Sequence, residues 1–296
     1  MSNTFSTTFY GKWILSGEHA VLRGHPAIIF PLKDKELKFS FTPSKDEIRA
    51  EFTGDYGEEI QFLFWSALER AIEILNLHHN DLSGKVVIEN DIPVGSGMGA
   101  SGALCVAIGR WLQQQGHVLE ANLFEFARQL ENLFHGESSG ADIAVAIAGA
   151  GIYFSRSGAM RPVKKAWQPQ WYSSYSDKPS PTSRCVKQVK EFMERKPKFA
   201  AEIDLKMAKS VKLAETALAM ENQEKALPML TQAINLGYNC FKTWGLTSGI
   251  VDNHIRLLKE AGSLAAKPSG SGGGGYVISL WDKEPPAELA ASLLKL

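Results

Sequence analysis

A glycine-dense segment at residues 91–104, DIPVGSGMGASGAL, constrains the fold of this chain more than any other feature. It follows an apolar, β-branched stretch at 85–89 and runs into a helical pattern at 103–114. Glycines let the backbone adopt positive φ and approach a ligand closely, so that consecutive N–H groups can point inward. The first turn of a helix adds unpaired donors and a partial positive charge. A strand followed by a glycine-rich turn and a helix therefore indicates an anion-binding site, and the expected ligand is phosphate.

On the motif alone, three interpretations of this segment stay open. Besides a phosphate site, Gly95, Gly97 and Ala100 fit the dinucleotide fingerprint G-x-G-x-x-A, with Glu120 at about the right distance to bind a ribose. Against that, only Val118-Leu119 stand before Glu120 as a second strand. A strand–helix turn without a ligand is the third interpretation. The chain contains no Walker A pattern.

The composition is that of an ordinary globular protein, with 44% hydrophobic and 22% charged residues among 296. The chain has 32 Lys+Arg and 32 Asp+Glu residues, so it has no net charge that would attract nucleic acid or a membrane surface. Cys105, Cys185 and Cys240 show neither CxxC nor zinc spacing, and free thiols fit a reducing cytosol. The N-terminus lacks a signal-peptide pattern, and no apolar run approaches the ~20 residues of a membrane span. We therefore expect a cytoplasmic protein with neither nucleic acid nor membrane as a partner.

The expected secondary structure changes character along the chain. Short strands dominate the first fifty residues, and helices and strands then alternate up to residue 176. Long helices follow, expected at 184–195, 200–220, 223–238 and 248–261. A strand is expected at 276–281 and a last helix from about residue 287. Strands first, then helices with a late strand, predict an α+β fold in two lobes.

Three further segments carry candidate site residues. Lys12 begins a short apolar strand, and His19 follows the turn at Gly17. Taken singly, such a lysine is most often a solvated strand end and such a histidine a structural one, although a buried lysine can stabilise a nearby anion. Asp142 precedes a run of small and apolar residues, which indicates a helix N-cap and is compatible with a catalytic carboxylate. The cluster Gly270–Gly275 is either a flexible linker or backbone that passes close to another group.

These four segments, in this order, resemble the GHMP kinase superfamily. Residues 93–103 resemble its ATP-loop signature P-x-G-x-G-L-G-S-S-A-A, with Met98, Ala100 and Gly102 as departures, and residues 267–275 resemble its third motif, K-L-T-G-A-G-G-G-G. Within the superfamily, residues 12–27 are similar to the opening of the mevalonate kinases, K-x-I-L-x-G-E-H-A-V-x-x-G-x-x-A. Their segment H-G-x-P-S-G-x-D corresponds to residues 135–142, where Ser138 replaces the proline and is expected to loosen the turn.

The resemblance implies a two-lobed GHMP kinase fold. Residues 1–180 would form an N-terminal ATP-binding domain like domain 2 of ribosomal protein S5, and residues 181–296 a ferredoxin-like C-terminal domain. It implies ATP and Mg²⁺ as cofactors and mevalonate as the acceptor, phosphorylated on its primary hydroxyl in the route to isoprenoids, and it leaves a homodimer open. The C-terminal sheet is expected to be one strand short or completed differently.

The resemblance also implies roles for matched positions. Asp142 would take the proton from the substrate hydroxyl, Lys12 would orient Asp142 and offset developing charge, and Ser101 and Glu131 would hold Mg²⁺. The ATP phosphates would be wrapped by Pro93, Gly95, Ser96, Gly97, Met98, Gly99, Ala100, Ser101 and Gly102. The acceptor would be contacted by Glu18, His19, Ser139, Gly270, Ser271 and Gly272.

Other functions remain open at this point. The run Gly-Ala-Asp-Ile-Ala at 140–144 has features of the phosphomevalonate kinases, whereas Gly-Glu-His at 17–19 favours the mevalonate kinases. Another GHMP small-molecule kinase is a further alternative. A catalytically inactive sensor that binds a nucleotide or metabolite is the alternative of a different class, and the presence of Lys12, Ser101, Glu131 and Asp142 argues against it.

Overall fold

The computed structural model describes residues 4–180, 182–247 and 249–296. The chain forms two compact units, each discontinuous in sequence. Unit 1 comprises Met1–Lys12, Pro31–Val94 and Met98–Ala150, and unit 2 comprises Trp13–Phe30, Gly95–Gly97 and Gly151–Leu296. Strands β1 (Phe5–Ser16) and β2 (Pro26–Pro43) each contribute to both units. The boundary between residues 180 and 181, which the resemblance implied for the two domains, stays a prediction.

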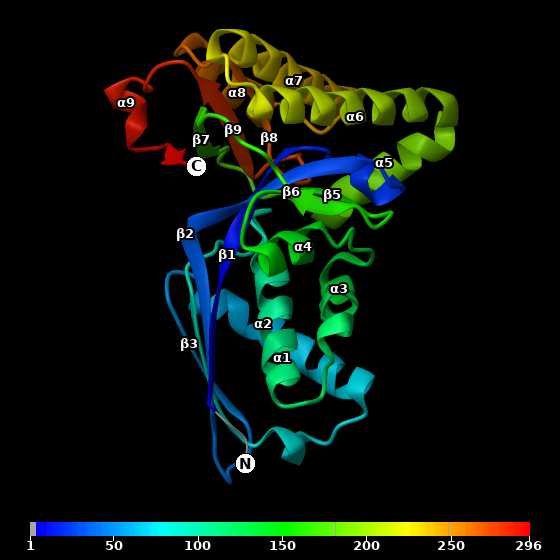
Figure 1. The fold of residues 1–296 in the computed structure, drawn as a ribbon, viewed down its shortest axis with the longest axis vertical. Coiled ribbons are helices and arrows are strands. Elements are labelled where there is room, and N and C mark those ends of the chain that lie inside the picture. Colours follow the sequence, from blue (N-terminus) through cyan, green and yellow to red (C-terminus); the bar gives the residue numbers. More distant parts are fainter. Residues whose placement is uncertain (1–3, 181, 248) are drawn as a thin grey trace. The chain divides into compact units, whose positions relative to one another are not determined.

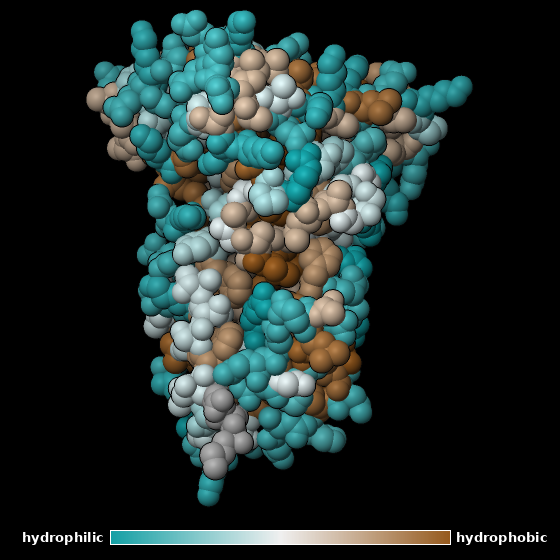
Figure 2. All heavy atoms as spheres, in the orientation of Figure 1, coloured by the Kyte–Doolittle hydropathy of each residue, from teal (hydrophilic) through white to brown (hydrophobic). Residues whose placement is uncertain are grey.

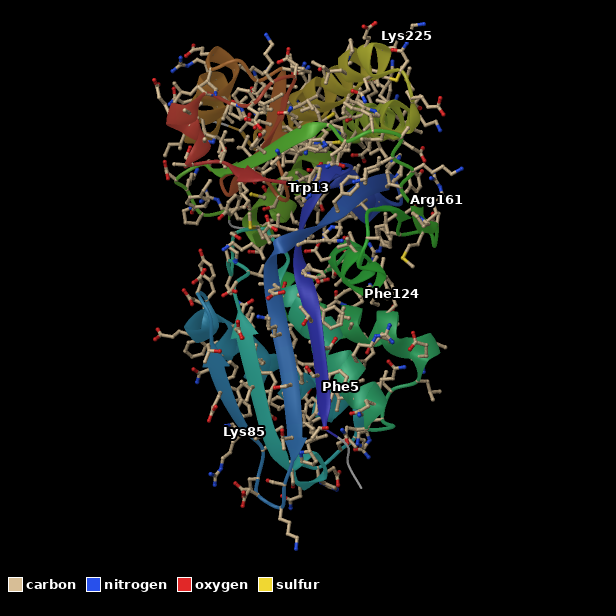
Figure 3. All side chains as sticks on the ribbon, turned by 60° about the vertical axis from the view of Figure 1, so that its left-hand side comes forward. Phe5, Trp13, Lys85, Phe124, Arg161 and Lys225 are labelled. Atoms are coloured by element: carbon tan, nitrogen blue, oxygen red, sulfur yellow. The ribbon has the colours of Figure 1, made fainter. Side chains whose placement is uncertain are left out.

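Unit 1 is a sheet with helices on one face (Figures 1 and 3). Its part of β2 pairs antiparallel with β4 (Gly84–Asn90), and β3 (Arg49–Thr53) runs parallel to β4. The helices are α1 (Gly57–Leu75), α2 (Ala100–Gln114), α3 (Leu123–His135) and α4 (Ala141–Ala148), with short 3₁₀ turns at His79–Leu82 and Glu120–Asn122. The buried residues of α1 recur at helical spacing, which gives that helix its sheet-facing side.

Aromatic rings of β2, α1 and α2 pack together in the core of unit 1. The ring of Trp111 on α2 lies 4.8 Å from that of Phe41 and 5.7 Å from that of Phe39 on β2, between ring centroids. Phe64 on α1 lies 6.4 Å from Phe39. Tilted ring pairs at these separations add to the free energy gained by burial. This packing fixes α2, which begins within the glycine-rich segment.

Unit 2 contains an antiparallel sheet in the order β10-β7-β9-β8. The strands are β7 (Gln170–Tyr175), β8 (Ala265–Pro268), β9 (Tyr276–Trp281) and β10 (Leu294–Lys295). Its helices are α5 (Thr182–Arg195), α6 (Pro197–Ala219), α7 (Gln223–Thr243), α8 (Ile250–Glu260) and α9 (Ala287–Ala290), and a 3₁₀ turn covers Ala20–Arg23. Helices α6 and α7 lie side by side (Figure 1), and the surface over them is largely hydrophilic (Figure 2). A smaller ladder pairs β5 (Ile152–Ser155) with Pro26–Ile29 of β2 and with β6 (Met160–Pro162).

The two-residue strand β10 completes the C-terminal sheet. Leu294 and Lys295 pair with Ser173 and Tyr172 of β7, and the N–H of Leu296 donates to the carbonyl of Trp171 at 3.0 Å. Both expectations for this sheet assumed that no strand follows the last helix, and both are wrong, because the short strand β10 follows α9 and forms the edge of the sheet. The α+β fold class is confirmed, and along the described ranges no helix is both long and apolar enough to cross a membrane.

Some sequence-based expectations of local structure were wrong. Strand β8 was missed because it contains Lys267 and Pro268, but it is an edge strand, where proline is tolerated. The expected N-cap at Asp142 is instead Gly140, with φ of 80°, and Asp142 lies in the first turn of α4. The helix expected over 248–261 is α8, and residue 248 lies outside the described residues.

Candidate active site

An ion pair in unit 1 joins β1 to α4. Nζ of Lys12 lies 3.1 Å from Oδ1 of Asp142, and the lysine side chain is only 6% exposed. The backbone N–H of Lys12 donates to the carbonyl of Met98 at 2.8 Å. A β-carbon on Gly99 would lie 2.7 Å from Cγ of Lys12 and 3.6 Å from Oδ2 of Asp142. The segment therefore needs glycine here, both for this approach and for its φ of 83°.

The first turn of α2 contacts two carboxylates. Gly99 is its N-cap, and the N–H of Ala103 is the one that returns to the carbonyl of Gly99, at 3.0 Å. The N–H groups of the residues before Ala103 come too early in the helix to bond a carbonyl of an earlier helical turn, and N–H groups at such a helix start favour an anion. A β-carbon on Gly102 would lie 2.9 Å from Cβ of Asp142 and 3.2 Å from Oε1 of Glu131. Both acids therefore lie beside this turn, which also carries Ser101.

Glu131 on α3 is a buried carboxylate, 2% exposed. Burial and, next, the negative charge of Asp142 raise its pKa to about 8. The hydroxyl of Ser138 donates to Oε2 of Glu131 and accepts from the N–H of Gly140 at 3.0 Å. The N–H of Ser138 donates to Oδ1 of Asn132 at 2.7 Å. The expectation that Ser138 loosens this turn is wrong, because the serine makes three hydrogen bonds, one within the turn to Gly140 and two to residues of α3.

The turn at Glu18 and His19 belongs to unit 2. Glu18 is paired with Nζ of Lys267, and the ring Nε2 of His19 lies 2.8 Å from the carbonyl of Ser271. Rings of Phe241 and Trp244 meet the imidazole edge-on, at 5.9 and 5.2 Å between centroids. Burial lowers the pKa of His19 to about 4, so the ring is neutral at physiological pH.

The two glycine clusters contact each other within unit 2. A β-carbon on Gly270 would lie 3.6 Å from the carbonyl oxygen of Gly97, and one on Gly275 would lie 3.0 Å from that of Ser96. The hydroxyl of Ser180 contacts that of Ser271 at 2.6 Å and donates to the carbonyl of Gly272 at 2.8 Å. The cluster is therefore packed backbone, and the linker interpretation is wrong.

The structure assembles the expected residues into two groups, one in each unit. Unit 1 brings together Lys12, Gly99, Gly102, Glu131 and Asp142, with Ser139 in the turn before α4, where its hydroxyl accepts from the N–H of Ala141 at 3.2 Å. The group in unit 2 comprises Glu18, His19, Gly95, Ser96, Gly97, Gly270, Ser271 and Gly272.

Sequence reasoning gave no role to two residues that contact this machinery, Lys267 and Ser138. The available signals were a lysine three residues before a glycine cluster and a serine where the motif has proline. The dinucleotide interpretation is wrong, because α2 leads into a 3₁₀ turn and α3 instead of a second strand. Glu120, its proposed ribose ligand, is paired with Arg110 at 2.6 Å.

Comparisons with known proteins agree with this architecture. Residues 63–150 match the GHMP kinases N terminal domain, and residues 221–295 match the GHMP kinases C terminal domain. The mevalonate kinase of Pyrococcus horikoshii is 30% identical over 91% of this chain and 86% of its own length. That of Thermococcus gammatolerans is 28% identical over 95% of this chain and 90% of its own length.

Solved structures share the fold. The mevalonate kinase of L. major in complex with R-mevalonate superposes with a TM-score of 0.77 at 22% identity, covering 99% of this chain and 95% of the other. The Methanococcus jannaschii mevalonate kinase gives a TM-score of 0.74 at 20% identity, covering 99% of this chain and 97% of the other. A phosphomevalonate kinase from Streptococcus pneumoniae gives 0.72 at 18% identity, covering 95% and 93%. With matching domains in both parts of its sequence and a relative at 30% identity, the chain belongs to the GHMP kinase family.

Proposed function

We propose that this protein transfers the γ-phosphoryl group of ATP to the primary hydroxyl of mevalonate. The observation that carries the proposal is the Lys12–Asp142 pair beside the first turn of α2. The curated relatives named mevalonate kinase, at 28% and 30% identity over more than nine-tenths of this chain, support mevalonate as the acceptor. The proposed location is the cytoplasm, which the free, buried thiols of Cys105, Cys185 and Cys240 support.

The proposed chemistry uses the carboxylate and the ammonium group together. As the acceptor oxygen bonds to the γ-phosphorus, its proton passes to Asp142 and the bond to the ADP oxygen breaks, with its electron pair leaving on ADP. Lys12, held at 3.1 Å, orients Asp142 and offsets the negative charge that develops on the phosphoryl oxygens. The reaction depends mainly on positioning and charge stabilisation, which suits a site built on a strand and two helix N-termini.

Phosphates of ATP would be bound by backbone. The first turn of α2 presents N–H groups without intrahelical partners, and the positive end of the helix dipole adds to their field. Positive φ at Gly95, Gly97 and Gly99 lets the preceding segment turn its own N–H groups inward. Pro93, Ser96, Met98 and Ala100 complete this proposed cradle.

The donor set fits Mg²⁺. Among the residues that the structure describes, no three His, Cys, Asp or Glu side chains gather to hold a metal by themselves. Mg²⁺ instead suits one or two carboxylates completed by a hydroxyl, waters and substrate phosphates. Glu131 is such a carboxylate, buried with a raised pKa that a cation would lower, and Ser101 lies on the neighbouring turn. When bound there, the ion would neutralise charge on the transferring phosphate.

A coupled ADP-release assay with ATP and Mg²⁺ tests the proposal, with mevalonate, phosphomevalonate, galactose and homoserine as acceptors. We expect turnover with mevalonate and little with the others. Turnover restricted to phosphomevalonate or to another acceptor would overturn the substrate assignment. Binding of ATP without turnover of any acceptor would instead indicate a catalytically inactive binding protein.

A further inference from the structure

Alternate residues of segment 267–271 hold β1 and the turn that follows it, all within unit 2. Lys267 is paired with Glu18. Oγ of Ser269 accepts from the N–H of Ile14 at 2.8 Å. The carbonyl of Ser271 lies 2.8 Å from Nε2 of His19, and because a carbonyl only accepts, the imidazole carries its proton on Nε2. The segment thus holds the backbone of β1 at Ile14 and the side chains of Glu18 and His19 in the turn.

The Glu18–Lys267 pair is fully enclosed. The side chains are 2% and 0% exposed, and Nζ of Lys267 also donates to the carbonyl of Pro268 at 2.7 Å. The ammonium lies 5.3 Å from the centroid of the Phe241 ring. Glycine at 237 makes room for the lysine, since a β-carbon there would lie 3.3 Å from Cδ and Cε of Lys267. Desolvating two charges offsets most of their attraction, so such a pair contributes geometry more than stability.

The turn held by this pair is strained. His19 has φ of 59°, a conformation that an L-residue other than glycine rarely adopts. A strained backbone of this kind is kept only where several surrounding contacts hold it in place. Glu18 is anchored on one side through Lys267, and the ring of His19 is anchored on the other through Ser271.

We propose that Glu18 and Lys267 are positioning residues. Their buried ion pair fixes His19 and Ser271 in the arrangement that binds the substrate whose hydroxyl accepts the phosphoryl group. This proposal rests on the proposed function and changes the sequence-based expectation for one residue. Glu18 acts through His19 and Ser271 and does not itself contact the acceptor.

The test replaces both charges with apolar side chains of similar size, in the double variant Glu18→Leu/Lys267→Met. Removing both partners avoids the uncompensated buried charge that a single substitution would leave. We expect a folded protein in which kcat/KM for mevalonate falls about ten- to hundredfold, mainly through KM for mevalonate, with KM for ATP unchanged. The matched control is Arg161→Met/Glu215→Leu, which removes another ion pair of unit 2 and is expected to keep wild-type kinetics.

A second readout needs no substrate. Nitrogen-15 NMR of His19 is expected to give a neutral Nε2–H tautomer in the wild type, and a tautomer mixture with a pKa nearer the ordinary value in the double variant. The other charged groups that act on His19, Arg23 and Asp204, are present in both proteins. Wild-type kinetics together with an unchanged His19 spectrum in the double variant would overturn the proposal. If the wild type does not turn over mevalonate, the proposed function fails, and the His19 spectra still decide whether the pair positions the turn.

Discussion

Nζ of Lys12 and Oδ1 of Asp142 lie 3.1 Å apart, although the two residues come from opposite ends of unit 1's sequence. Gly99 makes this approach feasible, because any β-carbon there would collide with the lysine side chain. A cation, a carboxylate and the N-terminus of α2 therefore lie together within unit 1. Four predictions follow from this group and from the turn at His19.

Replacing Asp142 with asparagine removes the proton acceptor while keeping the shape of the side chain. We expect kcat for mevalonate to fall by about a thousandfold or more, because general base catalysis and the Lys12 partner are lost together. ATP should still bind, since the first turn of α2 is unchanged. Steady-state kinetics and a nucleotide titration check this, and a variant with near-native kcat contradicts the base assignment.

Gly102→Ala should damage the site more than the fold. The added methyl group would lie 2.9 Å from Cβ of Asp142 and 3.2 Å from Oε1 of Glu131, so both carboxylates must move. We expect kcat to fall by about tenfold to a hundredfold, the range typical of small displacements of reacting groups. Gly109→Ala is the matched control on the same helix, where the new methyl meets the end of the Leu123 side chain at 2.8 Å. That control should lower the melting temperature and leave kcat unchanged, and equal losses of kcat in both variants would contradict the explanation.

Ser138→Ala removes the hydroxyl that donates to Glu131 and accepts from Gly140. Losing a buried hydrogen bond to a carboxylate costs about 1.5–3 kcal/mol. We expect the concentration of Mg²⁺ needed for half-maximal activity to rise, with KM for mevalonate unchanged. Ser66→Ala is the control, because Ser66 lies on the exposed face of α1, where its hydroxyl donates to the carbonyl of Phe62. The same Mg²⁺ requirement in both variants would show that Ser138 does not hold Glu131.

The buried imidazole of His19 should make the free energy of unfolding pH-dependent. Its pKa is about 4 in the folded chain against an ordinary value of 6.5, so between these values the unfolded chain binds more protons. The stability contributed by neutral His19 is therefore complete above pH 6.5 and is lost as the pH falls towards 4. We expect the stability difference between wild type and His19→Gln to shrink by up to about 3 kcal/mol over that interval. Denaturant unfolding at several pH values measures it, and a constant difference would contradict the burial of a neutral ring.

The sequence by itself determined the local elements of the site. The glycine-rich segment after 85–89 indicated an anion-binding turn and a following helix, and the structure has β4 and α2 in those places. Hydrophobic periodicity predicted the long helices of unit 2, with errors of up to five residues at their ends. These features depend on residues close together in the chain, whose spacing sets which face of an element is buried.

Only the tertiary structure decided which side chains meet. The partners of Glu131 and Glu18 are Ser138 and Lys267, and the latter pair is separated by most of the chain. The strand that carries Lys267 looked unlike a strand, and it forms because β9 supplies its hydrogen bonds. A buried charge selects its partner by the cost of leaving water, and that cost exists only after the chain has folded around it. The sequence therefore indicated the kind of site, and the fold decided which of its side chains contact one another.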